Sequence, residues 1–344
     1  MTNFGSSAPV ALSVSNVWKV FGRDHGSFKS RPASARTAEA MAKDHLVGAV
    51  QAASFDIRKG EVFVIMGLSG SGKSTLLRCL TRLIEPSEGE IRFDGQDILS
   101  LNETALADLR RRKMGMVFQH FALLPNRTVL GNIAFPLEVQ GIARAQAEDR
   151  ARELVSLVGL SGRESRLPSE LSGGQQQRVG IARSLATNPD FWFLDEPFSA
   201  LDPLIRADLQ DEVQRLQREH SRTAVFVTHD LDEAIRLADR IAIMENGRIV
   251  QIGTAEDLVT RPATDYVRRF VAKVPPARVI CASSLIKAPV AAVSGLTVSG
   301  DATIADIASK IVADAGEITV VDPMGKPIGL LDRQKALETM AMKI

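Results

Sequence analysis

A glycine-rich stretch between a strand and a helix places the strongest constraint on how this chain folds. Residues 67–75 read GLSGSGKST, directly after the apolar run VFVIM and before the helical pattern LLRCLTRL. Glycines let such a loop wrap closely around phosphates, and its backbone amides attract anions together with the helix N-terminus. We expect Lys73 to reach the outer phosphates of a nucleotide, the Ser74 hydroxyl to bind Mg²⁺, and Thr75 to support the first helical turn. The expected phosphate-binding residues are Gly67, Ser69, Gly70, Gly72, Lys73, Ser74 and Thr75.

Two adjacent carboxylates follow a second apolar run. Residues 191–197 read FWFLDEP, so Asp195 and Glu196 stand where a buried strand ends. Two acids at a strand end are usually only solvated, but these lie downstream of a phosphate-binding loop. Phosphoryl transfer needs a metal that neutralises phosphate charge and a group that aligns the nucleophile. We therefore expect Asp195 to hold Mg²⁺ and Glu196 to polarise the attacking water.

A second glycine-containing stretch begins a helix further along the chain. Residues 171–175 spell LSGGQ and precede QQRVGIARSLA. Ser172 is a plausible helix N-cap, and Gly173 and Gly174 let backbone amides approach another anion. Alone, this stretch would be an ordinary loop-to-helix cap.

Apolar strand-like runs alternate with helical patterns over most of the chain. EVFVIMG, MGMVFQ, FWFLDE and TAVFVTHD alternate with segments such as STLLRCLTRL and IRADLQDEVQRLQREH. This alternation predicts an α/β fold with a mainly parallel sheet. The chain has 344 residues, enough for one large and one small domain.

Composition excludes several functional classes. The net charge of +1 gives no field that would attract a nucleic acid, and the two cysteines cannot form a disulfide framework. No apolar run approaches the roughly 20 residues of a membrane span, and the first residues lack the pattern of a secretion signal. We expect a soluble, cytoplasmic protein that works at a membrane only through another subunit.

Two breaks in the pattern suggest domain organisation. About residues 22–50 form an interruption rich in Ser, Ala and charged residues, which we interpret as a solvated surface insertion with one short helix near residues 35–44. Pro275 and Pro276 follow an amphipathic helix and mark a second boundary. The predicted domains are residues 1–276 and 277–344.

The order of these motifs resembles the ATP-binding-cassette (ABC) ATPases. LSGGQ between the phosphate-binding loop and LDE is diagnostic of that family. Within the resemblance, Phe21 matches the aromatic that stacks on adenine, and Gln119 the residue that touches Mg²⁺ and the membrane partner. Residues 199–202 (SALD), ending at Asp202, match the D-loop, and His229 matches the histidine that contacts the γ-phosphate. The residues matching the segment that binds ATP from a second cassette are Ser172, Gly173, Gly174 and Gln175.

The resemblance implies fold, cofactors and partners together. It implies a P-loop cassette with a RecA-like core, an antiparallel β subdomain and a helical subdomain, which binds ATP and Mg²⁺. Because ATP is sandwiched between the P-loop of one cassette and the LSGGQ of another, it implies a head-to-tail pair of copies. It also implies attachment to membrane permease subunits at the cytoplasmic face of the cell membrane, through the surface around Gln119 and FALLPNRTVLGNIAF.

Flanking segments are similar to the ATPase subunits of bacterial glycine betaine, proline and choline importers. The similarity covers about residues 10–273 and includes the insertion. It implies an importer ATPase for quaternary-ammonium osmolytes, which works indirectly with a substrate-binding protein. Two alternatives remain: an importer for another solute such as an amino acid, and a soluble cassette acting on nucleic acid or ribosomes. A non-catalytic cassette is disfavoured because Lys73, Gln119, Glu196 and His229 are all present.

The C-terminal stretch ITVVDPMGKPIGLLDRQKAL, residues 318–337, predicts strand, turn, strand and helix. With a helix expected over residues 301–316, it resembles one cystathionine-β-synthase-type (CBS) repeat, and the chain has room for only one. The Ser or Thr and the Asp that usually contact ribose are replaced by Asp332 and Lys335. We therefore expect a small α+β domain that serves as a dimer contact rather than a nucleotide sensor.

Overall fold

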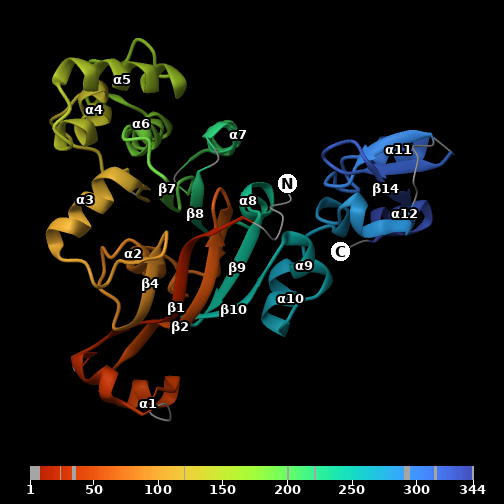
Figure 1. Cartoon of the computed structure of the whole chain (residues 1–344), viewed down its shortest axis with the longest axis horizontal. Helices are drawn as coiled ribbons and strands as arrows, with labels where there is room; N and C mark the ends of the chain where they lie inside the picture. The colour runs from red at the N-terminus through yellow and green to blue at the C-terminus, as the bar shows by residue number, and fades with distance from the viewer. Residues whose placement is uncertain are drawn as a thin grey trace. The chain divides into compact units, whose positions relative to one another are not determined.

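A computed structural model describes the chain over most of its length. The described residues are 8–23, 25–32, 36–119, 121–199, 201–220, 222–289, 295–313 and 316–342. They divide into two compact units, one made of residues 8–237 and 242–249 and the other of residues 238–241 and 250–342. Figure 1 shows the order of the helices and strands along the chain.

The first unit begins with an antiparallel sheet whose strand order is β2-β1-β4-β5. Its strands are β1 (Val10–Phe21), β2 (Val47–Arg58), β4 (Glu88–Phe93) and β5 (Gln96–Asp97). The ring of Phe93 meets the ring of Phe191 edge-on with centroids 4.6 Å apart. This contact joins the antiparallel sheet to the central sheet.

The central sheet has the strand order β10-β9-β3-β8-β7-β6. Its strands are β3 (Val62–Met66), β6 (Met114–Val117), β7 (Phe191–Asp195), β8 (Thr223–Thr228), β9 (Arg240–Glu245) and β10 (Arg248–Gly253). The pairs β3–β8, β8–β7 and β7–β6 are parallel. Every residue of β3, β7 and β8 is buried, which explains why these strands read as continuous apolar runs.

Helices complete the first unit. They are α2 (Lys73–Leu80), α3 (Glu103–Lys113), α4 (Val129–Val139), α5 (Arg144–Leu157), α6 (Gly173–Leu185), α7 (Pro203–His220) and α8 (Leu231–Leu237). Helices α4, α5 and α6 pack on one another as a group (Figure 1). The predicted cassette, with its parallel core, antiparallel sheet and helical part, is confirmed.

The insertion after β1 contains the expected short helix but is not merely solvated. It holds a 3₁₀ helix (His25–Ser30) and α1 (Ala38–Lys43) before β2 begins at Val47. Phe28, Met41 and Leu46 are buried within it. A solvated insertion would leave such side chains in water, so this segment is packed against the rest of the fold.

The described residues of the second unit form four short helices and a small mixed sheet. Its helices are α9 (Ala255–Thr260), α10 (Asp265–Val271), α11 (Ala308–Ala313) and α12 (Arg333–Ala341), with 3₁₀ turns at Pro276–Arg278 and Ala282–Leu285. The sheet order is β11-β14-β13-β12, from Ile286–Ala288, Pro327–Leu331, Ile318–Val321 and Leu296–Ser299. Strands β12 and β13 are parallel, and the other two pairs are antiparallel.

The predicted strand, turn, strand and helix of residues 318–337 are confirmed as β13, β14 and α12. The helix expected over residues 301–316 is wrong in its first half, because α11 begins only at Ala308. The amides of Ile304 and Ala305 instead donate to the carbonyls of Ile280 and Ala277. Those bonds replace the helical ones that the sequence pattern predicts.

The boundary between the compact units differs from the domain boundary that the sequence predicts at residue 276. Helices α9 and α10, which we assigned to the first domain, cluster with the C-terminal segment. The division at residues 276 and 277 stays a prediction. No helix in the described part of the chain is both long and apolar enough to cross a membrane.

Close packing between β6 and α6 yields a stability prediction. A Cβ at Gly115 would lie 2.3 Å from the carbonyl oxygen of Ser184, so Gly115→Ala should cost about 1–3 kcal/mol of unfolding free energy. Gly131→Ala is the control, because a Cβ there would meet nothing nearer than 3.4 Å and alanine favours helices. Urea unfolding followed by tryptophan fluorescence measures both variants. An unchanged urea midpoint for Gly115→Ala would contradict the close packing of β6 on α6.

Candidate functional site

The phosphate-binding loop follows β3 and can accept only glycine at two positions. Gly67 and Gly72 have φ angles of +154° and +100°. A Cβ on Gly67 would lie 2.2 Å from the carbonyl oxygen of Met244, and one on Gly72 would lie 2.0 Å from that of Ala49. The loop is therefore held between β2 and the segment around β9, and its backbone is fixed before any ligand binds.

Lys73 is fixed on the same loop. Its ammonium group donates to the carbonyl oxygens of Gly67 and Leu68, both at 3.0 Å, and the side chain is almost fully buried. Burial lowers the pKa of Lys73, while the nearby charges of Glu196 and Asp195 act in the opposite direction. The ammonium group thus lies beside the loop, near two carboxylates. Ser69 and Gly70 are exposed, and Ser74 and Thr75 are partly buried.

Ser74 and Asp195 meet although 121 positions separate them. The Ser74 hydroxyl lies 2.6 Å from Asp195 Oδ1, and the guanidinium of Arg78 lies 3.4 Å from Oδ2. Asp195 is fully buried at the end of β7. Strand register explains the meeting, because β3 and β7 both pair in parallel with β8 and end at the same edge of the sheet. Arg78 was missed by the sequence reasoning, although it lies on the predicted helix after the loop.

Glu196 lies between Gln119 and His229. Its Oε2 is 3.3 Å from Gln119 Nε2 and 3.2 Å from His229 Nδ1. Glu196 has a φ of +45°, the left-handed region that L-residues rarely adopt, and its amide still donates to Val227 at 3.0 Å. Such strain is commonly stored at functional sites. Two predicted residues from separate segments, Gln119 and His229, therefore lie beside the carboxylate of a third, Glu196.

A network of hydrogen bonds supports the turn that carries His229, and the sequence did not indicate it. The Thr228 hydroxyl lies 2.6 Å from Glu233 Oε2, and it accepts from the amide of Asp230 at 3.0 Å. Burial raises the pKa of the Glu233 carboxyl, and the Asp230 charge acts in the same direction. Arg206 of α7 donates to Asp230 at 3.2 Å and to the carbonyl of Leu201 at 3.3 Å. Through these bonds, the turn that holds His229 is attached to the segment that follows β7.

The D-loop candidate, residues 199–202, is described only in part, because Ala200 lies outside the described residues. Asp202 is exposed, and its carbonyl accepts from the amide of Arg206 at 2.9 Å. Asp202 therefore lies at the start of α7.

The LSGGQ segment begins α6. The Ser172 hydroxyl accepts from the amide of Gln175 at 3.4 Å, and the Gln175 side chain accepts from the amide of Ser172 at 3.1 Å. This reciprocal pair is a capping box, so the predicted N-cap is confirmed. Gly173 forms the first position of α6 and Gly174 the second. The segment lies in the helical group, whereas the phosphate-binding loop precedes α2 beside the central sheet (Figure 1).

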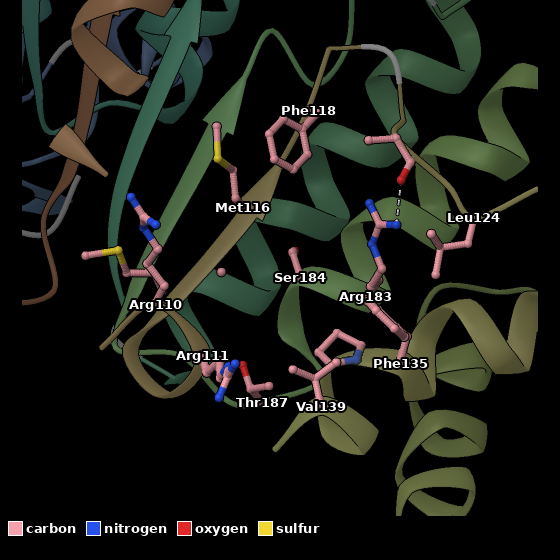
Figure 2. Close-up of a pocket in the computed structure, with 14 residues that line it drawn as sticks. Arg110, Arg111, Met116, Phe118, Leu124, Phe135, Val139, Arg183, Ser184 and Thr187 are labelled. Carbon is pink, nitrogen blue, oxygen red and sulfur yellow. Dashed lines mark hydrogen bonds between the residues drawn. The ribbon is translucent and has the colours of Figure 1, made fainter. Parts of the chain in front are cut away.

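A groove of about 390 Å³ lies between α3 and β6 on one side and α4 and α6 on the other (Figure 2). Arg183 of α6 crosses it and donates to the carbonyls of Phe121 and Ala122 at 3.0 and 2.7 Å. Met116, Phe118 and Leu124 are among its apolar lining residues, and Arg110 and Arg111 of α3 also line it. Its lining includes Arg110, Arg111, Met116, Phe118, Leu124, Phe135, Val139, Arg183 and Thr187. It lies along the segment after Gln119 that the sequence marks as the surface for a membrane partner.

Phe21 ends β1 and keeps 42% of its surface exposed. An exposed aromatic ring offers a face on which a base can stack. The part of the chain that the structure describes contains no group of three His, Cys, Asp or Glu side chains arranged to hold a metal ion.

Comparisons with known proteins show which family shares these features. A profile of the family described as ABC transporter matches residues 50–199. The trimethylamine N-oxide transport system ATP-binding protein of Ruegeria pomeroyi is 52% identical over 96% of this chain and 96% of that protein. Its counterpart in Pelagibacter ubique is 49% identical over 97% of this chain and 98% of that protein.

Two further matches are informative. The glycine betaine/proline betaine transport system ATP-binding protein of Escherichia coli is 47% identical over 81% of this chain and 70% of that protein. A dimeric ATP-binding cassette in a post-hydrolysis state, bound to ADP and Pi, matches with a TM-score of 0.62 and 32% identity. That match covers 71% of this chain and 98% of the cassette.

The arrangement around Glu196 predicts the effect of one substitution. Glu196→Gln should lower the rate of ATP hydrolysis by about 100-fold or more, because an amide cannot accept a proton from water. ATP binding should persist, since the phosphate-binding loop is untouched. Phosphate release and nucleotide binding by a fluorescent analogue measure the two effects. Glu90→Gln, at a half-buried residue of β4 that pairs with Arg92, is the control and should change neither. Full turnover by Glu196→Gln would contradict a role for the Glu196 carboxylate in accepting a proton from water.

Proposed function

This chain belongs to the ATP-binding proteins of ABC transporters and is an ATPase, and we propose that it powers an importer of methylated-amine osmolytes. The observation that carries this proposal is the match to the two trimethylamine N-oxide system proteins over nearly the whole of both chains. The betaine relatives match over less of this chain and less of their own length. Trimethylamine N-oxide is therefore the first candidate solute, followed by glycine betaine.

ATP binding would use the prearranged loop. The amides of residues 67–75 and the start of α2 would receive the phosphates, and Lys73 would turn from its loop carbonyls toward the outer ones. Phe21 would stack on the adenine ring. The low exposure of Lys73 favours this use, because a buried ammonium group gains more from an approaching anion than a solvated one does.

The oxygen donors at the loop fit Mg²⁺. This ion prefers hard oxygen ligands and usually keeps several waters beside one or two carboxylates and substrate phosphates. The Ser74 hydroxyl and the buried Asp195 carboxylate already face each other at 2.6 Å, and the Gln119 amide lies next to Glu196. We assign Ser74, Asp195 and Gln119 as the residues that would hold the ion. When bound, Mg²⁺ would supply positive charge to the phosphate oxygens.

Glu196 is the group that would orient the attacking water. Its carboxylate is held from both sides by Gln119 and His229. It lies at the edge of the sheet from which the phosphate-binding loop begins. His229, on the turn fixed by Thr228 and Asp230, would contact the γ-phosphate. Hydrolysis therefore depends on residues from three strand ends.

The second half of each ATP site would come from another copy of the chain. Ser172, Gly173, Gly174 and Gln175 begin α6, in the helical group rather than at the phosphate-binding loop. Pairing two copies head to tail would bring each LSGGQ to the other copy's loop. The solved dimeric cassette supports this arrangement by its likeness to the present chain. Asp202, at the start of α7, would belong to the same contact between copies.

Permease subunits would bind at the groove beside α4. Its apolar lining residues and three arginines suit a short amphipathic segment with acidic ends, inserted from a membrane subunit at the cytoplasmic face. A substrate-binding protein would deliver the solute to that permease. The chain itself would hold no solute, and we expect no nucleic-acid partner.

The C-terminal segment would add a contact between copies. We propose that residues 277–344 form one CBS-type repeat, because β12, α11, β13, β14 and α12 follow one another in that order, and that this repeat pairs with that of the partner copy. A variant lacking residues 277–344 should dimerise more weakly in light scattering while it retains basal ATP hydrolysis. Loss of all hydrolysis in this variant would contradict a role limited to pairing or regulation.

One competing solute class has support. The methionine import ATP-binding protein of Staphylococcus haemolyticus is 46% identical over 67% of this chain, so the catalytic core alone does not distinguish solutes. The net charge of +1 argues against a non-transport cassette that acts on nucleic acid.

Uptake measurements test the proposed solute. The chain, reconstituted in liposomes with the permease encoded beside it, should import labelled trimethylamine N-oxide when ATP is present inside. Unlabelled glycine betaine should compete more strongly than methionine. Glu196→Gln serves as the matched control and should abolish uptake. ATP-dependent methionine uptake without trimethylamine N-oxide or betaine uptake would refute the solute class and leave the ATPase assignment intact.

A further inference from the structure

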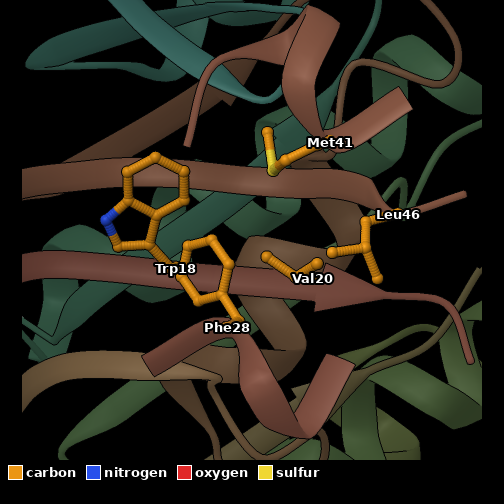
Figure 3. Close-up of a cluster of buried hydrophobic side chains, with 5 residues drawn as sticks. All are labelled: Trp18, Val20, Phe28, Met41 and Leu46. Atoms are coloured by element: carbon orange, nitrogen blue, oxygen red, sulfur yellow. The ribbon is translucent and has the colours of Figure 1, made fainter. Parts of the chain in front are cut away.

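The insertion between β1 and β2 packs on one face of β1. Phe28, Met41 and Leu46 come from the insertion and bury themselves against Trp18 and Val20 of β1 (Figure 3). We call these five side chains the insertion core. Each is at most 7% exposed, and the rings of Trp18 and Phe28 lie 5.1 Å apart. Fully burying such side chains stabilises a structure by about 1.5–3 kcal/mol each, so the insertion holds this strand firmly.

Arg36 closes the insertion core. Its guanidinium lies 4.7 Å from the ring centroid of Phe28 and 6.0 Å from that of Trp18. The same group forms an ion pair with Glu88 of β4 at 2.9 Å and donates to the carbonyl of Arg31 at 3.1 Å. A single side chain therefore joins the insertion to two strands of the antiparallel sheet.

Both ends of the insertion meet at Phe21. Phe21 pairs with Val47 across β1 and β2, and Gly22 has a φ of +137°. A Cβ on Gly22 would lie 2.6 Å from the carbonyl oxygen of His45. The segments in which the chain leaves and re-enters the sheet are thus packed against each other next to Phe21. We call this contact the neck.

The opposite face of β1 carries Lys19 and Phe21. The Lys19 ammonium lies 4.9 Å from the centroid of the Phe21 ring and donates to the carbonyl of Glu85 at 2.9 Å. That bond fixes the ammonium over one face of the ring. Cation–π attraction then holds the ring in one orientation.

We propose that Lys19 and the insertion core are a positioning device for Phe21, which presents a single ring face to a purine base. The insertion core supports the strand from behind, the neck at Gly22 limits its movement, and Lys19 covers the inner ring face. The inference rests on the proposed stacking of adenine on Phe21. It adds to it a positioning residue, Lys19, and a role for the insertion.

A double-mutant cycle tests the proposal by the KM for ATP. Phe21→Ala should raise KM about tenfold or more, since stacking is lost. Lys19→Met, which keeps an apolar side chain without the charge, should raise KM about two- to fivefold with kcat unchanged. Lys19→Arg should restore the normal KM because the cation is retained. In the Phe21→Ala background, Lys19→Met should have no further effect. Lys29→Met, at an exposed lysine of the insertion, is the matched control and should be silent.

The KM values distinguish the positioning role of Lys19 from the stacking of adenine on Phe21. An unchanged KM for Lys19→Met, while Phe21→Ala raises it, would overturn the positioning role and leave stacking on Phe21 in place. An equal rise of KM for Lys19→Met in both backgrounds would also overturn it, because Lys19 would then act on the nucleotide directly. An unchanged KM for Phe21→Ala would refute stacking itself.

The role of the insertion core is tested by Phe28→Ala, which should raise KM for ATP in the same range as Lys19→Met while kcat is retained. Where this variant fails to fold, Arg36→Met, which removes the ion pair with Glu88, takes its place with the same expected rise. A folded variant of either kind with normal KM would show that the insertion does not act on Phe21.

Discussion

The phosphate-binding loop depends on backbone packing from segments far away in the sequence. Gly247, in the turn between β9 and β10, donates its amide to the carbonyl of Ser71 at 3.0 Å and accepts from the amide of Gln51 at 2.8 Å. The Gln51 side chain donates to the carbonyls of Gly48 and Asn246. The loop therefore has its shape imposed by β2 and this turn. A loop fixed in this way need not reorganise when it binds phosphate.

Parallel pairing then determines where the chemistry can occur. Met66 pairs with Thr228, and Asp195 pairs with Val227. The next residue of each strand is thus Gly67, His229 or Glu196, and all three leave the sheet at the same edge. Ligand sites of open α/β sheets lie at this edge, outside the carboxyl ends of the strands. The positions of Gly67, Glu196 and His229 at one edge of the sheet follow from this register.

Much of the fold and site could be predicted from local patterns, because each pattern reports a local constraint. The continuous apolar runs of β3, β7 and β8 indicate strands buried on both faces, and LSGGQ indicates a capped helix. The network of Arg206, Asp230 and Glu233 could not be predicted, because it depends on how α7 packs near α8. The insertion was expected to be solvated because its composition is polar. Its three buried apolar side chains are spaced too irregularly to produce a helical or strand period.

In the proposed pair, each ATP site is built from the phosphate-binding loop of one copy and the LSGGQ segment of another. Mixing two inactive variants, Lys73→Ala and Ser172→Arg, tests this most directly by ATP hydrolysis at constant total protein. A mixed pair would contain one site with both defects and one intact site. Hydrolysis should reappear on mixing, at a rate well above the sum of the rates of the separate variants. Hydrolysis that stays at that sum, although light scattering shows mixed pairs, would contradict it.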